Sequence, residues 1–192
     1  MEKQSKTTEN SLSLIDFDTI PIELKMFENI ERIRLRGINS NNIFGLEMFN
    51  KLRILETEML WEFDLSNNPK WLKNIEIIHS NKTKFIGLNS FKQLPNLKEV
   101  KISFSGFEPF PKDFESLKCL KYFQTGAHRF GEIILSEIDL SKMNCLEYVE
   151  LHSWWKNLKG IPKGIETVNK VKIHHGNLSK REKEILKNKT SG

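Results

Sequence analysis

The stretch LKEVKI, residues 97–102, places apolar side chains at Leu97, Val100 and Ile102, and this spacing returns along most of the chain. The same apolar-x-x-apolar-x-apolar pattern is found seven times, and a shorter first copy precedes it. A period of this length with this spacing is typical of an architecture built from stacked repeats. The last positions of the eight copies, separated by 20 to 26 residues, are Leu14, Leu35, Thr57, Ile77, Ile102, Thr125, Leu151 and Ile173.

The second half of each copy predicts a short β-strand, because alternate apolar residues then point to one side. A single strand with its return segment cannot bury an apolar face by itself. Parallel stacking of neighbouring repeats gives a continuous core, and the stability is then shared between adjacent repeats. We therefore expect an α/β solenoid of about eight short parallel strands.

The return segments carry a second pattern, apolar-Pro-x-x-apolar, followed three residues later by another apolar residue. It occurs around Pro21, Pro111 and Pro162. Proline ends extended structure and can open a helical turn, and the three-residue apolar spacing suits a short 3₁₀ segment. The pattern predicts that the chain returns through 3₁₀ turns that face the core. Aromatic residues of these segments, Phe104, Phe107, Phe110, Trp61 and Trp71, are expected to fill the same side.

Together the two patterns resemble the leucine-rich repeat family, whose repeats read LPxxLxxLxxLxLxxN. The resemblance extends over residues 12–178 and implies an arc with the strands on its concave face and an irregular or 3₁₀-helical convex side. The family's asparagine, three residues after the last strand position, is replaced in every copy, and only Ser80 and Ser105 come close to it in character. The repeats are therefore degenerate.

The two ends of the chain are expected to differ from the repeats. Residues 1–11 are predicted to be a disordered tail, residues 12–178 the repeat domain, and residues 179–192 a C-terminal capping helix and tail. Ser179 and Glu182 have the spacing of a capping box, and Leu178, Ile185 and Leu186 can face the last repeat. This end resembles the closing helix of many bacterial leucine-rich repeat proteins.

Composition favours a single globular domain. The chain has 192 residues, of which 38% are hydrophobic and 29% charged. It contains no apolar run long enough for a transmembrane helix, and its first residues lack the pattern of a secretory signal peptide. We expect a cytoplasmic protein. The net charge of +5 arises within residues 169–192, where a solvated capping helix and a phosphate-binding tail are the two interpretations.

Cys119 and Cys145 each stand directly before the first apolar residue of a repeat. Equivalent positions of adjacent repeats lie about one strand spacing apart, so the two thiols are expected to be neighbours. They are either small buried residues or a redox-sensitive pair. No cluster of Cys or His has the spacing of metal ligands, and we expect neither a metal nor a cofactor.

The residues between the inward apolar positions point to the concave face, where a partner would bind. Three arginines, an acidic patch and two tyrosines at equivalent positions stand out, and the arginines can alternatively pair with the glutamates across the sheet. Trp155 is added as the exposed member of the pair Trp154 and Trp155. The candidate partner-binding residues are Arg32, Arg34, Arg36, Glu56, Glu58, Glu76, Lys101, Tyr122, Gln124, Tyr148, Glu150, His152, Trp155 and Lys172.

Catalysis has little support in the sequence. His152, near Glu150 or His174, is a weak acid–base candidate, and no phosphate-binding loop, nucleophile elbow or HExxH motif is present. We therefore expect a protein-binding module rather than an enzyme, in the role of an intracellular inhibitor, an immunity-type protein or an adaptor. The alternative is a nucleic-acid or anionic-surface binder working through the basic C-terminal end, although the acidic patch disfavours nucleic acid on the concave face. The oligomeric state stays open.

Overall fold

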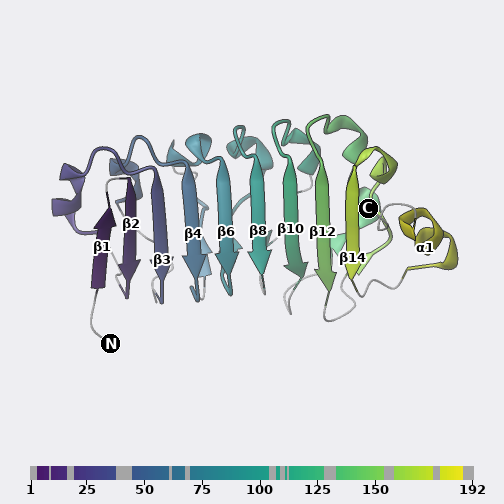
Figure 1. The fold of residues 1–192 in the computed structure, drawn as a ribbon, viewed down its shortest axis with the longest axis horizontal. Helices are drawn as coiled ribbons and strands as arrows, with labels where there is room; N and C mark the ends of the chain where they lie inside the picture. Colours follow the sequence, from purple (N-terminus) through teal and green to yellow (C-terminus); the bar gives the residue numbers. More distant parts are fainter. Residues whose placement is uncertain are drawn as a thin grey trace.

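The computed structural model describes residues 4–8, 10–16, 20–37, 45–60, 62–67, 70–103, 107–108, 111, 113–127, 133–153, 158–174 and 178–187. Within them, nine strands form one long sheet (Figure 1). In spatial order they are β1 (Gln4–Thr8), β2 (Ser11–Ile15), β3 (Arg32–Arg36), β4 (Ile54–Glu58), β6 (Ile77–Asn81), β8 (Glu99–Ser103), β10 (Tyr122–Ala127), β12 (Tyr148–Ser153) and β14 (Lys170–His174).

From β2 to β14 the described strands are all parallel, which confirms the predicted stack of eight. The first strand is an addition. β1 pairs with β2 in the antiparallel sense, with Ser5 opposite Leu14. The prediction of a disordered tail over residues 1–11 is therefore wrong for residues 4–8, because this segment completes the sheet at its N-terminal edge.

The core lies directly beneath the sheet, where alternate strand residues point inward. In β2, Leu12 and Leu14 are fully buried, and the same alternation holds in the strands that follow. Polar residues also occupy inward positions, as Thr57 does in β4 and Ser80 in β6. Thr57 and Ser80 are both buried, and the Thr57 hydroxyl donates to Ser80 Oγ over 2.7 Å. Because the hydroxyls satisfy each other, they can replace aliphatic residues at little cost.

In β6 the register differs from the prediction by one residue. The residues that point into the core are Ile78 and Ser80 rather than Ile77, and Ile77 lies opposite Ile54 on the solvent-facing, concave side of the sheet. The first two positions of the pattern are apolar in both registers, but only the predicted one also ends on an apolar residue, Ile77. The buried Ser80 hides the correct choice from a reading based on apolar residues.

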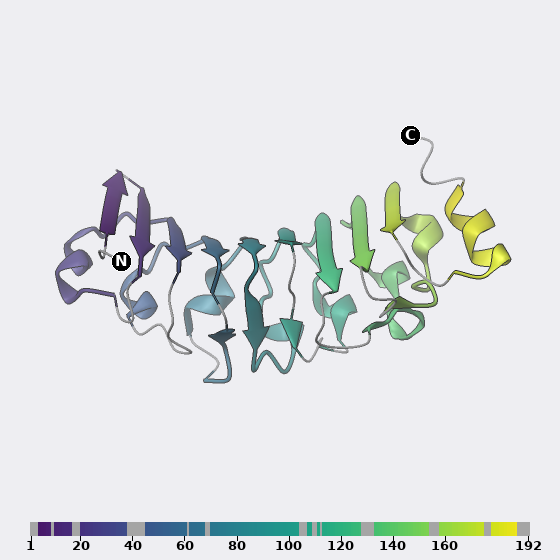
Figure 2. The same ribbon diagram turned by 90° about the horizontal axis from the view of Figure 1, so that it is seen from below.

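The outer side of the arc consists of 3₁₀ turns and two small parallel sheets, and the main sheet lies along the inner side (Figure 2). The turns are η1 (Ile22–Met26), η2 (Leu46–Met48), η3 (Lys70–Asn74), η4 (Phe91–Gln93), η5 (Phe114–Ser116), η6 (Leu135–Glu137), η7 (Leu140–Lys142) and η8 (Ile165–Thr167). The sequence did not predict the two small sheets. One consists of β5 (Glu62–Asp64), β7 (Lys84–Ile86) and β9 (Phe107–Glu108). The other consists of β11 (Ile133–Ile134) and β13 (Leu158–Lys159).

Aromatic residues hold the small sheet of β5, β7 and β9 to the rest of the core. Phe63, Phe85 and Phe107 occupy neighbouring strands with ring centroids 5.7 and 5.3 Å apart. Trp71 packs edge-on against Phe63. The burial of Phe107 and Trp71 confirms their predicted place; Phe104, Phe110 and Trp61 lie outside the described residues.

In four consecutive repeats the residue that follows the main-sheet strand has a left-handed backbone conformation. Asp16, Gly37, Met59 and Lys82 directly follow their strands and have φ between 56° and 65°. The N–H of each donates to the next strand, as in Met59 N to Asn81 O at 2.8 Å. This hydrogen bond ends the strand and turns the chain toward the outer side. Non-glycine residues adopt this conformation at a cost of about 1–2 kcal/mol.

The C-terminal end is closed by α1 (Lys180–Lys187). The predicted capping box forms: Ser179 N donates to Glu182 Oε2 at 2.7 Å, and Glu182 N donates to Ser179 Oγ at 3.3 Å. Leu186 is buried and Leu178 packs against the core, whereas Ile185 is more exposed than predicted.

Candidate partner-binding surface of the main sheet

The inner, concave face of the main sheet presents its side chains in three straight rows. The rows are straight because the parallel strands are paired residue by residue without slippage. The first row is Ser11, Arg32, Ile54, Ile77, Glu99, Tyr122, Tyr148 and Lys170. The second is Ser13, Arg34, Glu56, His79, Lys101, Gln124, Glu150 and Lys172. The third includes Ile15, Arg36, Glu58, Asn81, Ser103 and His152.

Ion pairs connect β3 to β4 at the N-terminal end of the face. Arg34 Nη2 donates to Glu58 Oε2 at 2.7 Å, and Arg36 Nε lies 3.8 Å from the same oxygen. Arg32 Nε lies 4.0 Å from Glu56 Oε1. The predicted pairing of arginines with glutamates across the sheet is confirmed. Three guanidinium groups share two carboxylates, so this end keeps a surplus of positive charge.

His79 connects the two halves of the face. Its Nε2 lies 2.7 Å from Glu99 Oε1, and its Nδ1 lies 3.9 Å from Glu56 Oε1. Glu99 also meets Lys101, whose Nζ lies 2.5 Å from Oε1. Partial burial raises the pKa of Glu99, but the hydrogen bonds from Lys101 and His79 outweigh it and hold this pKa below its ordinary value. Glu99 therefore stays ionised between two donors.

The cations on this face are more exposed than the carboxylates that they pair with. The side chains of Arg32 and Arg34 are 51% and 53% exposed, whereas those of Glu56 and Glu58 are 25% and 23% exposed. Lys101 is likewise more exposed than Glu99. The carboxylates lie close to the sheet, and the longer basic side chains extend over them. A partner that approaches the face meets positive charge first.

Two tyrosines stack at the same position of neighbouring strands. The rings of Tyr122 and Tyr148 have centroids 4.3 Å apart and an interplanar angle of 5°. Lys101 Nζ lies 4.7 Å from the Tyr122 centroid, and Lys172 Nζ lies 5.9 Å from that of Tyr148. A lysine is therefore associated with each ring, at distances that suit cation–π attraction. Both tyrosines are half-buried, and the pair lies between the two lysines.

The hydroxyl of Tyr148 belongs to a short hydrogen-bonded chain. It donates to Glu150 Oε2 at 2.6 Å, while Glu150 Oε1 lies 2.9 Å from His152 Nε2. Desolvation, followed by the hydrogen bond to the Glu150 carboxylate, raises the pKa of Tyr148. The predicted approach of His152 to Glu150 is confirmed. The tyrosine stays protonated, so this chain serves to orient the ring.

Most of the predicted surface residues lie on this face. Glu76 does not: because of the shifted register it precedes β6, where its carboxylate lies 2.8 Å from Lys98 Nζ and 4.0 Å from Arg53 Nη1 at the edge of the sheet. Trp154 and Trp155 lie outside the described residues. The sequence analysis did not assign His79 and Asn81 to the face, because the buried Ser80 between them hid the correct register of β6.

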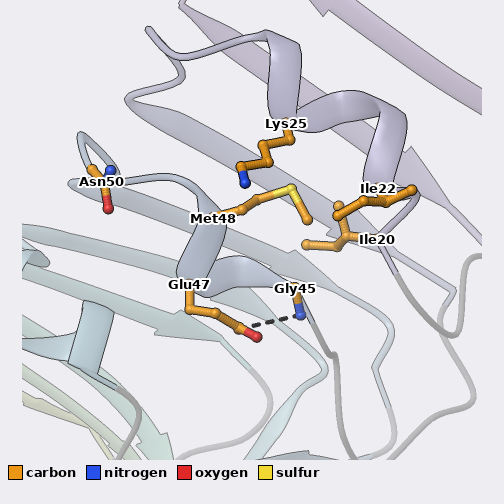
Figure 3. A pocket seen from close by; sticks show the side chains of 7 residues that line it. All are labelled: Ile20, Ile22, Lys25, Gly45, Glu47, Met48 and Asn50. Carbon is orange, nitrogen blue, oxygen red and sulfur yellow. Dashed lines mark hydrogen bonds between the residues drawn. The ribbon is translucent and has the colours of Figure 1, made fainter.

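A separate groove lies between η1 and η2 (Figure 3). It has a volume of about 560 Å³ and combines apolar with charged side chains. Ile22 is 66% exposed, and Gly45 N donates to Glu47 Oε2 at 3.2 Å. Its lining residues are Ile20, Ile22, Lys25, Gly45, Glu47, Met48 and Asn50.

The described residues include no group of three or more His, Cys, Asp or Glu placed to hold a metal ion. Among the same residues, none of the helices has the length and apolar character that crossing a bilayer requires.

The parallel stack, the 3₁₀ return turns and the capped end define a leucine-rich repeat fold. Solved structures support this assignment. An internalin, InlF, from Listeria monocytogenes has a TM-score of 0.58 at 13% identity, over 88% of this chain and 48% of that chain. A Leptospira interrogans leucine-rich repeat protein has a TM-score of 0.51 at 18% identity, over 90% of this chain and 56% of that chain. These likenesses are to the fold.

Sequence comparison gives relatives at about one-quarter identity. The chain is 26% identical over 167 residues to the volume-regulated anion channel subunit LRRC8D of Rattus norvegicus, which is 81% of this chain and 19% of that protein. It is 25% identical over 186 residues to the human subunit LRRC8A, which is 90% of this chain and 22% of that protein. The chain thus spans about a fifth of the length of these curated relatives. No family model matches it.

Proposed function

We propose that this chain is a protein-binding module that contacts its partner with the inner face of the main sheet. The stacked pair Tyr122 and Tyr148 is the observation that supports this proposal most strongly. Tyrosine is enriched among the residues that carry binding energy at protein interfaces. Here two rings are held in one orientation by each other and by flanking lysines. Little side-chain freedom is left to lose on binding, which favours affinity.

The charge distribution supports a partner with carboxylates at its contact surface. Arg32, Arg34 and Arg36 are the most exposed groups of the ion pairs between β3 and β4, and only two carboxylates balance them. An acidic partner would gain from this surplus, chiefly through faster encounter and better discrimination. Because Glu56, Glu58 and Glu99 interrupt the basic residues, the face suits a protein surface better than a uniform phosphate backbone.

Affinity capture from the native cell extract tests the proposal. The wild-type chain is compared with a variant in which Arg34, Glu56, Tyr122 and Tyr148 are changed to Ala. A matched control, Lys92→Ala with Glu137→Ala, changes exposed residues of η4 and η6 on the outer side. Both variants keep the net charge of the wild type. We expect a nuclease-resistant protein partner that the control retains and the face variant loses.

Two other results would contradict the proposal. A partner retained by the face variant would exclude the inner face as the binding site. Tight binding of purified chain to RNA, DNA or anionic vesicles at physiological salt, lost on removal of residues 179–192, would instead support a binder of anionic surfaces through the basic C-terminal end.

The more specific role follows from what the partner does once bound. We propose an inhibitor, an immunity-type protein or an adaptor, because a preformed face with anchored aromatics suits stable coverage of another protein. An inhibitor or immunity-type protein lowers the activity of its captured partner in proportion to occupancy. An adaptor leaves that activity unchanged and brings a third protein into the complex.

A further inference from the structure

We propose that Cys119 and Cys145 form a dithiol modification site, which a low-molecular-weight disulfide converts into an intramolecular disulfide. This inference is independent of the proposed function. Both cysteines are free and exposed, so the expectation of two small buried residues is wrong. Exposure matters because a thiol must reach its reagent before it can react.

The two cysteines occupy the same place in two successive repeats. Cys119 lies in the turn after η5, closed by Leu120 N donating to Leu117 O at 3.2 Å. Cys145 lies in the turn after η7, closed by Leu146 N donating to Met143 O at 3.0 Å. Each stands three residues before its strand, and those strands start with Tyr122 opposite Tyr148. The register therefore places Cys145 directly beside Cys119.

Backbone and side-chain contacts hold the two turns together. Glu147 N donates to Lys121 O at 2.9 Å, immediately before the paired strands begin. Lys118 Nζ, next to Cys119, donates to Lys142 O at 3.3 Å. Neighbouring parallel segments lie about 4.8 Å apart, and a disulfide requires Cα atoms about 4.4–6.8 Å apart. The spacing of the repeats meets this requirement.

The turn positions equivalent to Cys119 and Cys145 in the other repeats form a column along the sheet. Side chains in this column contact the adjacent repeat. Lys51 Nζ donates to Asn29 Oδ1 at 2.6 Å, and these residues occupy the positions equivalent to the two cysteines. Asn74 and Asn96, also in this column, donate to the backbone of the preceding repeat at 3.4 and 2.7 Å. A residue here is thus in contact range of the adjacent repeat, and only the C-terminal part of the column offers two thiols.

The chemistry proceeds in two exchange steps. The thiolate of one cysteine attacks a sulfur of the small disulfide RSSR, forms a mixed disulfide and releases one RS⁻. The thiolate of the second cysteine attacks the protein sulfur of this mixed disulfide and releases the second RS⁻. The protein dithiol loses two electrons and two protons, and RSSR is reduced to two RSH. Because the resulting bond is exposed, an excess of RSH reverses both steps.

The linkage would join the repeats that carry the stacked tyrosines. Cys119 and Cys145 precede Tyr122 and Tyr148 by three residues each, so the new bond would fix the spacing of these strands at their N-terminal ends. It would also close the segment of the long repeat between them. Closing such a loop restricts the unfolded chain and raises the melting temperature.

The test uses purified full chain at low micromolar concentration. The reduced protein is incubated with 2-hydroxyethyl disulfide, remaining thiols are alkylated, and intact mass and cross-linked peptides are read by mass spectrometry. We expect the loss of two hydrogens, no adduct, and one linked peptide pair containing Cys119 and Cys145. The oxidised form should melt higher by roughly 5–10 °C, and dithiothreitol should reverse both changes.

The single variants Cys119→Ser and Cys145→Ser are the matched controls. Each retains one exposed thiol and no resolving thiol, so each should stop at a stable adduct of one RS group without a change in melting temperature. The proposal is overturned if the wild-type chain accumulates two RS adducts, keeps two alkylatable thiols, or links only between molecules in proportion to protein concentration.

Discussion

The ring of Tyr122 lies parallel to that of Tyr148, with 4.3 Å between their centroids, on the face of the sheet that the outer turns do not cover. Aromatic pairs of this kind contribute about 0.5–1.5 kcal/mol beyond the area that they bury. We expect the two residues to be coupled in a double-mutant cycle of Tyr122→Ala, Tyr148→Ala and the double variant. Urea unfolding should give a coupling free energy in this range. Additive effects, within about 0.3 kcal/mol, would mean that the rings do not stack in solution.

The buried pair of Thr57 and Ser80 gives a prediction about the core. Ser80→Ala leaves the Thr57 hydroxyl buried without its 2.7 Å partner and should cost about 1–3 kcal/mol. Replacing both residues, as Thr57→Val with Ser80→Ala, removes both polar groups and should restore most of that loss. Denaturant unfolding of the three variants measures this. A double variant less stable than Ser80→Ala would contradict this account. It would show that the two hydroxyls stabilise the core by more than their hydrogen bond to each other.

Residues with a left-handed backbone conformation give a pair of predictions about stability, a gain for one substitution and a loss for the other. Met59→Gly should stabilise the chain by about 0.5–1 kcal/mol, because Met59 has φ 58° and the residue is 52% exposed. Gly87→Ala should destabilise it by about 1–3 kcal/mol, because an added Cβ would lie 2.5 Å from Ser66 N. Thermal unfolding compares them, and a loss of stability in Met59→Gly would contradict the strain argument.

Asp113 gives a prediction about pH. Partial burial raises the pKa of its carboxyl, but hydrogen bonds from Ser90 Oγ, at 2.5 Å, and Phe91 N, at 2.9 Å, outweigh it and lower this pKa. A lowered pKa adds stability above the pKa of the unfolded chain, near 3.9, and this stability is lost as the pH falls through the folded value.

We therefore expect Asp113→Asn to be less stable than wild type by about 0.5–1 kcal/mol at pH 7, the low end for a partly exposed group. The difference should shrink below about pH 4. Chemical unfolding at several pH values measures it, with Glu115→Gln on the same turn as a control. A difference that stays constant from pH 7 to pH 2 would exclude the carboxylate as its source.

The repeat period predicted the parallel stack because burial at two inward positions per strand constrains almost every copy. It failed at β6, where the apolar spacing fits two registers and Ser80 is inward only because Thr57 satisfies it. β1 was missed since it adds a strand outside the repeat. The small outer sheets were missed because their strands of two or three residues are too short for a pattern of alternation.

The candidate surface was predictable to the extent that it follows from register. Tyr122 and Tyr148 were expected side by side and are. The arginine–glutamate contacts were one of two expectations, and Arg34 Nη2 lies 2.7 Å from Glu58 Oε2. The other expectation, that these residues bind a partner, stays a proposal. The lower exposure of the carboxylates could not be predicted, because it depends on how the longer Arg34 side chain lies over Glu58. The exposure of Cys119 and Cys145 likewise depends on turn geometry.

Calorimetric titration of the purified chain with its captured partner tests the central claim most directly. The dissociation constant is compared for the wild type, Tyr122→Ala with Tyr148→Ala, and the outer-side control Lys92→Ala with Glu137→Ala. If the tyrosine pair anchors the partner, the double variant should bind at least about 100-fold more weakly, while the control binds as the wild type does. A double variant that binds within about threefold of the wild type would contradict the account.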